Sequence, residues 1–157
     1  MKLDEQVRNH RAARLDGVWE SSGDVLEIPI RFQGGAFAPV EEALINEVLH
    51  DMSLYVEGCI SFVDDTTAKE RFPYVYVRRY DSQGGYDPGC WSYVGNVHDH
   101  SQSLNLGHGC MTKRTIQHEF LHALGFFHEH TRPDRDDYIK GRWFLKLDLK
   151  ITNKITN

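Results

Sequence analysis

The first third of the chain changes from a strand-like to a helix-like spacing of apolar residues. Residues 25–32 alternate apolar and polar side chains, which predicts a strand. Pro29 within this strand indicates an edge position or a bulge, because proline has no amide hydrogen to donate to a neighbouring strand. Residues 40–56 repeat apolar side chains at helical spacing. Pro39 favours a helix start there and Gly58 favours its end.

The remainder predicts four more strands and a second helix. Strands are expected over residues 59–63, 74–79, 91–95 and 101–106, which are rich in β-branched and aromatic residues or alternate in polarity. A helix is expected over residues 113–127. Its predicted core contacts are Phe120, Leu121, Leu124 and Phe127. This order predicts an α+β fold, in which a twisted mixed sheet of about five strands is backed by two long helices.

Composition and charge narrow the class of protein. The chain has 157 residues, enough for one domain with its own core. A formal net charge of -5 and the absence of a dense Lys/Arg stripe argue against a nucleic-acid partner. The apolar runs are too short for a transmembrane segment. Residues 1–6 are polar and lack the apolar stretch of a signal peptide.

The second predicted helix contains a metal-binding pattern. His118 and His122 are four residues apart, so both imidazoles leave the same helix face and can share one zinc ion. Gly125 permits a sharp turn after the helix, which would bring His128 back as a third nitrogen ligand. Three protein ligands leave zinc an open position for water, as in catalytic sites. Glu119 lies beside the first ligand, where it can reach that water and act as general base.

The interpretation of this pattern without a functional site is a soluble helix with two incidental histidines. The glycine and the third histidine at fixed offsets argue strongly against it. In a zinc site the metal would lower the pKa of its bound water toward ~7 and polarise the scissile carbonyl. Glu119 would then take the proton of that water and pass it to the leaving amine. The pattern therefore predicts a zinc peptidase of the metzincin type.

The sequence around this helix resembles one metzincin family in particular. His118 to Asp136 matches the astacin signature HExxHxxGFxHExxRxDRD without a gap. Residues 89–95 and 106–110 also resemble astacin segments, and the likeness runs from about Trp19 to Ile139. The resemblance implies a zincin-like fold and a metalloendopeptidase that binds one Zn²⁺ per chain and cleaves protein or peptide substrates.

The resemblance has further implications for individual residues. It implies a secreted enzyme made as a zymogen, with Cys90 and Cys110 joined in a disulfide. It implies that Glu129 contacts the new N-terminus after propeptide removal, and Arg8-Asn9 is the expected boundary. A simple solvated role for Arg8 is about as well supported. In the family Cys59 would pair with a cysteine near the C-terminus, and this sequence has no cysteine after Cys110.

The two ends of the sequence differ from the family. We expect a propeptide remnant over residues 1–8, the N-terminal part of an astacin-like catalytic domain over 9–140, and a divergent low-complexity tail over 141–157. The methionine turn and the zinc-site tyrosine of the family have no counterpart in this sequence. We therefore expect a fragment with the C-terminal subdomain largely missing. The alternatives to an active protease are a catalytically inactive or truncated zinc-binding remnant and, less favoured, a structural zinc module.

Other candidate residues receive plainer interpretations. His98 and His100 flank Asp99, where a solvated loop is favoured over a second metal site. His130 is expected on the surface. The charged residues of 132–136 are expected to brace a turn through ion pairs. The strand at 91–95, or its neighbour, is a candidate for pairing with an extended substrate, although an ordinary core strand fits equally well.

Overall fold

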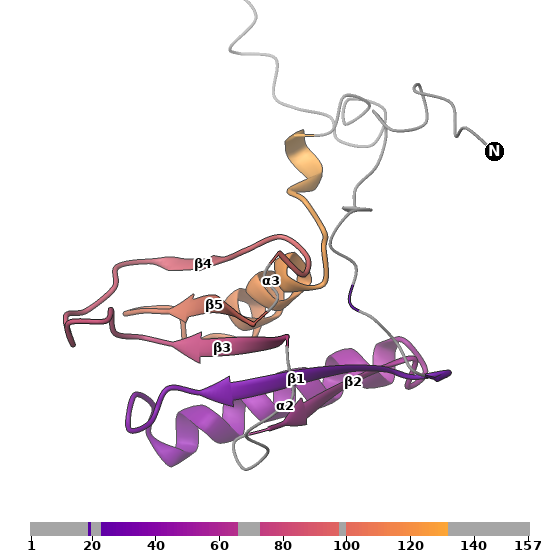
Figure 1. Cartoon of the computed structure of the whole chain (residues 1–157), viewed down its shortest axis with the longest axis horizontal. Coiled ribbons are helices and arrows are strands. Elements are labelled where there is room, and N and C mark those ends of the chain that lie inside the picture. Colours follow the sequence, from indigo (N-terminus) through magenta and orange to yellow (C-terminus); the bar gives the residue numbers. More distant parts are fainter. Residues whose placement is uncertain (1–18, 20–22, 66–72, 98–99, 132–157) are drawn as a thin grey trace, which may run out of the picture. The chain divides into compact units, whose positions relative to one another are not determined.

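A five-stranded sheet is the frame of the computed structural model, which describes Trp19 and residues 23–65, 73–97 and 100–131 (Figure 1). Its strands are β1 (Leu26–Phe32), β2 (Ile60–Asp64), β3 (Tyr74–Arg78), β4 (Cys90–Ser92) and β5 (Ser101–Leu106). Their order is β2-β1-β3-β5-β4. Neighbouring strands are parallel, except that β4 is antiparallel to β5. The predicted mixed sheet is confirmed.

Two helices, α2 (Pro39–Tyr55) and α3 (Lys113–Ala123), pack against the sheet (Figure 1). The start of α2 has proline in its first turn, and the Glu41 carboxylate accepts a hydrogen bond from the Ala38 amide. The start of α3 is capped by Thr112, whose hydroxyl accepts from the Thr115 amide at 3.2 Å. A short 3-10 helix, η1 (Glu129–Thr131), follows. The two predicted long helices are thus confirmed, but the second ends four residues before Phe127.

The layer between helices and sheet is apolar and fully buried. Phe120 is 0% exposed and meets the Phe62 ring edge-on at 5.5 Å between centroids. Burial of such a side chain contributes about 1.5–3 kcal/mol. The strands and helices supply most of this core: Ile28, Ile30, Ile45, Val48, Leu49, Val75, Val77, Leu104, Leu106, Ile116 and Phe120.

The predicted core contacts of α3 were only partly correct. Phe120 is buried and Leu124 packs against the core, as expected. Leu121 is 36% exposed and Phe127 is 45% exposed, so the prediction was wrong for both. The burial predicted for Leu121 is wrong because α3 turns a different face toward the core. The burial predicted for Phe127 is wrong because this residue lies beyond the end of the helix.

Pro29 was expected at a sheet edge or a bulge, and this was wrong because β1 lies between β2 and β3. The Leu26 amide donates to Cys59 and the Ile30 carbonyl accepts from Asp65, so even-numbered residues of β1 bond toward β2. The nitrogen of Pro29 therefore faces the β3 side, because backbone groups alternate along a strand. Pairing with β3 begins only at Ile30. Proline is tolerated here because the β3 ladder has not yet begun.

Not all of the chain is described. The elements other than η1 belong to one compact unit within residues 13–127, and His128–Thr131 are the described residues of a second. The predicted propeptide boundary at Arg8-Asn9, the charged turn at 132–136 and the tail at 141–157 lie outside the described residues. No described helix is both long enough and apolar enough to cross a membrane.

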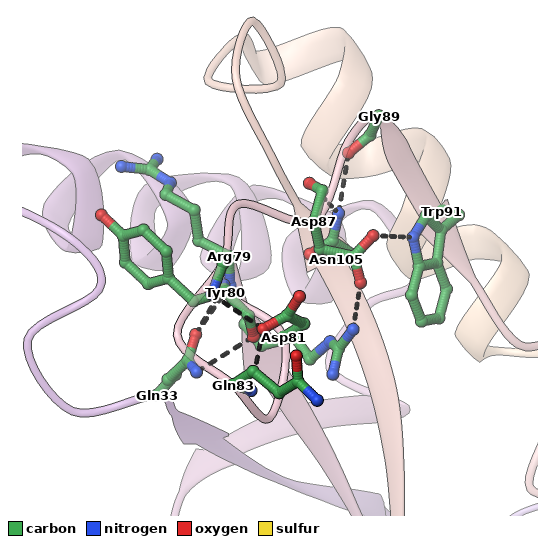
Figure 2. Close-up of polar contacts among 11 residues, drawn as sticks. Gln33, Arg79, Tyr80, Asp81, Gln83, Asp87, Gly89, Trp91 and Asn105 are labelled. Atoms are coloured by element: carbon green, nitrogen blue, oxygen red, sulfur yellow. Dashed lines mark hydrogen bonds and ion pairs between the residues drawn. The ribbon is translucent and has the colours of Figure 1, made fainter.

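Polar side chains hold the backbone that follows β3 (Figure 2). Gln33 accepts from the amides of Arg79 and Tyr80 at 2.9 Å each, and its Nε2 donates to the Tyr80 carbonyl at 3.1 Å. Asn105 donates to the carbonyls of Asp87 and Gly89 at 3.1 and 2.8 Å. The carboxamides of these two side chains hydrogen-bond to the backbone much as a neighbouring strand would. They therefore fix the loop between β3 and β4.

An ion pair joins this region to the start of α2. The guanidinium of Arg79 donates to the Glu41 carboxylate at 2.8 and 3.0 Å, and its Nε donates to the Leu106 carbonyl at 3.2 Å. Arg79 is buried, with 8% of its surface exposed. Its hydrogen bonds, together with that from Ala38, hold the pKa of Glu41 below its ordinary value. The pair therefore neutralises a charge that is largely shielded from water.

Glu41→Gln is expected to lower the free energy of unfolding by about 1–3 kcal/mol at neutral pH, because Arg79 would lose its charged partner. The pair stabilises the fold above the ordinary carboxyl pKa of the unfolded chain. That contribution is lost as the pH falls through the lower pKa of the folded state. The difference between wild type and variant should therefore shrink on acidification to about pH 3.

Urea unfolding across this pH range measures the effect. Glu42→Gln removes the same charge from the same first turn without touching Arg79, and serves as the control. A loss of stability in Glu41→Gln that stays constant with pH would contradict the expectation.

Candidate metal centre

The end of α3 is a turn in which each carbonyl of the last helical residues has a partner. The Phe126 amide donates to the Leu121 carbonyl at 3.0 Å, and the Gly125 amide donates to the His122 carbonyl at 2.8 Å. This pair of bonds is the Schellman arrangement, which requires a left-handed residue just after the helix. Gly125 supplies it, with φ of 108°. The turn predicted from Gly125 is therefore present, and it explains why α3 stops at Ala123.

This turn also orients the second histidine of the motif. The Nδ1 of His122 lies 2.7 Å from the Phe126 carbonyl, which can only accept, so Nδ1 carries the proton. The Nε2 of His122 therefore presents its lone pair, and it lies 3.1 Å from the Nε2 of His118. His122 is buried and His118 is exposed. A hydrogen bond from one ring nitrogen that leaves the other for a metal is typical of histidine ligands.

The geometry of the two motif histidines on α3 suits a zinc ion. His128, the third histidine of the motif, follows the turn at Gly125 in the sequence. Two nitrogen ligands at ~2.0–2.1 Å from a tetrahedral zinc stand roughly 3.3 Å apart, close to the 3.1 Å between His118 and His122. Nitrogen donors at this spacing, without a carboxylate among them, fit zinc better than magnesium or calcium. The residues present thus fit the group that the motif predicts.

Glu119 is the carboxylate of the motif. It follows His118 on α3 and is 5% exposed. Burial raises the pKa of Glu119, and the nearby His122 opposes that shift. A carboxylate whose pKa is brought toward neutrality is a better proton acceptor and donor near neutral pH. The site therefore combines nitrogen donors for a metal with a buried acid–base group.

The structure contains the predicted disulfide between Cys90 and Cys110. It joins β4 to the turn before α3, and so links an edge strand to the helix that carries His118. Such a cross-link reduces the conformational freedom of the unfolded chain. In the part of the chain that the structure describes, Cys59 is exposed and has no disulfide partner. The predicted contact of Glu129 with a mature N-terminus stays a prediction, because that side chain and residues 1–18 lie outside the described part.

The remaining histidines that the structure describes occupy exposed positions. His130 is exposed, as predicted, and its ring lies 5.2 Å from that of His128. His100 is exposed, while His98 and Asp99 lie outside the described residues.

Two backbone contacts at the end of α3 were not predicted from the sequence. The indole Nε1 of Trp19 donates to the Ala123 carbonyl at 2.8 Å, and Trp19 is buried. The Gly95 amide donates to the His122 carbonyl at 2.9 Å. Gly95 lies in a loop where the strand of residues 91–95 was expected. That strand instead begins at Cys90 and ends at Ser92, before the left-handed Gly95 with φ of 74°.

Comparison with known proteins identifies relatives for this arrangement. Meprin A subunit beta from Rattus norvegicus is 60% identical over 65 residues, which cover 41% of this chain and 9% of that protein. An astacin-like metalloendopeptidase from Coturnix japonica is 44% identical over 104 residues, covering 66% of this chain and 23% of that protein. The chain thus spans less than a quarter of each of these relatives.

A solved structure is also similar. High choriolytic enzyme 1, a hatching enzyme zinc-protease from Oryzias latipes, matches with a TM-score of 0.63 at 28% identity. The match covers 91% of this chain and 61% of that chain. The α+β fold expected from the order of elements, and the zincin-like fold implied by the resemblance, are therefore confirmed.

The family model of Astacin (peptidase family M12A) matches residues 18–147. The match includes both histidines of α3, Glu119 and the disulfide, and it extends past Ile139. Because it covers most of the 157 residues, the chain belongs to the astacin family of zinc metalloproteases.

Proposed function

We propose that this chain carries the catalytic centre of a zinc-dependent metalloendopeptidase, with His118, His122 and His128 as the zinc ligands. The observation that carries this proposal is the pair of ring nitrogens of His118 and His122, 3.1 Å apart on the helix that also carries the buried Glu119. His128 is the third histidine of the same motif. Membership of the astacin family supports the same chemistry. The substrates would be proteins or peptides.

Glu119 is proposed as the general base. Zinc, when bound, acts as a Lewis acid that activates water and polarises the scissile carbonyl. The Glu119 carboxylate accepts the proton of the attacking water and then delivers it to the amine nitrogen as the peptide bond breaks. The proton thus moves from water to the leaving group through one side chain. The buried position of Glu119 favours this role because it keeps bulk water away from the transferred proton.

The edge strand β4 is proposed to align the substrate. It is the last strand in the sheet order, and among the described strands only β5 pairs with it. An extended peptide can add to such an edge through backbone hydrogen bonds. The disulfide of Cys90 holds this strand to the turn before α3, which supports delivery of a peptide bond to the zinc helix. The expected alternative, an ordinary core strand, is less well supported because β4 is three residues long and only partly buried.

Secretion and zymogen activation are further parts of the proposal. The disulfide of Cys90 and Cys110 supports an oxidising compartment, since cytosolic thiols are kept reduced. Family membership supports synthesis as a zymogen, in which Glu129 would contact the N-terminus after propeptide removal.

Metal removal tests the proposed function. The purified chain should contain one zinc ion, measured by mass spectrometry of the metal, and should cleave an unstructured protein such as casein. A chelator should abolish cleavage, and added zinc should restore it, because the ligands without zinc cannot activate water. A chain that contains no zinc would refute the proposed site.

The same measurements distinguish an active metalloendopeptidase from the alternative, a catalytically inactive or truncated zinc-binding remnant. One zinc per chain without chelator-sensitive cleavage would support that alternative. The two results differ because zinc binding needs only the three nitrogen donors, whereas hydrolysis also needs an aligned substrate and a competent base.

A further inference from the structure

We propose that Gln102 is a positioning residue of the zinc site, because its buried carboxamide orients Gly95 so that the Gly95 amide holds the backbone of His122. The proposal rests on the proposed function, in which His122 is a zinc ligand. Gln102 itself touches neither the proposed metal nor the substrate. Its effect would pass through two hydrogen bonds and one glycine.

Both ends of the Gln102 carboxamide hydrogen-bond to the same loop, residues 95–97. Gln102 lies on β5 and is 1% exposed. Its Nε2 donates to the Gly95 carbonyl at 2.9 Å, and its Oε1 accepts from the Val97 amide at 3.1 Å. A buried amide that bonds to backbone at both ends fixes that backbone, because any displacement leaves polar groups unpaired away from water. Residues 95–97 are therefore held in one position relative to β5.

The other side of Gly95 faces the zinc helix. Its amide donates to the His122 carbonyl at 2.9 Å, and Gly95 has φ of 74°. This left-handed conformation sets the direction of the amide relative to the carbonyl that Gln102 holds. When Gln102 fixes the carbonyl, it therefore also aims the amide at His122. The connection runs from a side chain of β5 to the backbone of a proposed metal ligand.

The His122 carbonyl lies where α3 ends and the helix no longer supplies its partners. It accepts from both Gly125 and Gly95. The Gly125 bond comes from the turn that follows the helix, whereas the Gly95 bond comes from a separate part of the chain. Because metal ligands must be held within about 0.5 Å of their productive geometry, support of a ligand backbone from outside its own helix affects metal affinity.

Gln102→Met tests the proposal, since methionine keeps the length and apolar stem but removes both hydrogen bonds. Gln33→Met is the matched control (Figure 2). Gln33 also holds backbone through its amide, at Arg79 and Tyr80, in the loop region after β3. Both variants remove a backbone-holding carboxamide from the same chain. Of the two glutamines, only Gln102 is connected to His122 through Gly95. A general loss of stability should therefore appear in both variants, and a loss of zinc affinity only in Gln102→Met.

The measured quantities are zinc affinity by competition with a chromophoric chelator, the visible absorption bands of the Co²⁺-substituted protein, and the midpoint of thermal unfolding. We expect Gln102→Met to weaken zinc binding by about 10–100-fold and to shift the Co²⁺ bands. Gln33→Met should change zinc affinity by less than about twofold despite lower thermal stability. Equal zinc affinities in the two variants would overturn the role of Gln102. If the wild type still binds zinc in that case, the proposed function stays intact. A wild type without zinc would refute both.

Hydrogen exchange of the wild type provides a measurement that does not depend on folding of the variants. Zinc binding should slow exchange of the Gly95 amide by more than about tenfold, because this amide is bonded to a proposed ligand residue. The amides of Arg79 and Tyr80, held by Gln33, should change by less than about twofold. A Gly95 amide that responds no more than these two would overturn the proposal.

Discussion

Glu119→Gln is expected to lower kcat/KM for peptide hydrolysis by about 10²–10⁴-fold while leaving zinc bound. Glutamine keeps the size of the buried side chain but cannot accept a proton at neutral pH. The proposed ligands are the three histidines, and Glu119 is not among them. Metal affinity should therefore change little, and the loss should fall on the chemical step.

Hydrolysis of a quenched fluorescent peptide and metal content measured on the same preparation test this expectation. Glu42→Gln, which makes the same change on the first turn of α2, controls for removal of one negative charge. Retained hydrolysis in Glu119→Gln would rule out this residue as the base. A parallel loss of zinc would indicate a structural contribution to the metal site instead.

His122→Ala is expected to weaken zinc binding by more than about 100-fold. The change removes a nitrogen donor that lies 3.1 Å from the Nε2 of His118. It also removes the contact between Nδ1 and the Phe126 carbonyl, which closes the turn after the helix. Two remaining histidines cannot complete the three-ligand set of a catalytic zinc site.

Metal stoichiometry after gel filtration, with circular dichroism to follow folding, measures the outcome. His108→Ala is the matched control, because His108 is an exposed histidine in the turn between β5 and α3. The control should retain one zinc per chain. Unchanged stoichiometry in His122→Ala would contradict the assignment of this ligand.

Local sequence patterns were sufficient for most elements of the fold. The strand of residues 101–106 and the helix starting at Pro39 agree with the structure, because apolar periodicity and capping residues act within a few residues of one another. Pro29 was misassigned because its tolerance depends on where pairing with β3 begins. That register is a relation between distant segments and leaves no local signal.

Helix ends and burial were predicted less well than helix existence. Phe127 continues the apolar spacing of α3, yet the chain turns at Gly125 and leaves Phe127 exposed. Leu121 has the same apolar character as Phe120 but faces away from the core. The face that a helix buries is set by its neighbours in space, so polarity alone could not separate these two residues.

The candidate site also has features that the sequence predicted and features that it did not. The sequence alone determined which residue types are present at which spacing, and from this came the histidines of the motif, Glu119, Gly125 and the astacin family. Backbone geometry explains that success, because a separation of four residues on a helix brings two side chains to one face whatever surrounds it.

Only the tertiary structure decided how the end of the zinc helix is held. Trp19 donates to Ala123, and Gly95, itself oriented by Gln102, donates to His122. The donors Trp19 and Gly95 lie tens of positions away in the sequence from their acceptors Ala123 and His122, and neither donor belongs to the HExxH motif. Their roles arise because the last carbonyls of a helix have no partner within it, and only the folded chain determines which distant donors reach them.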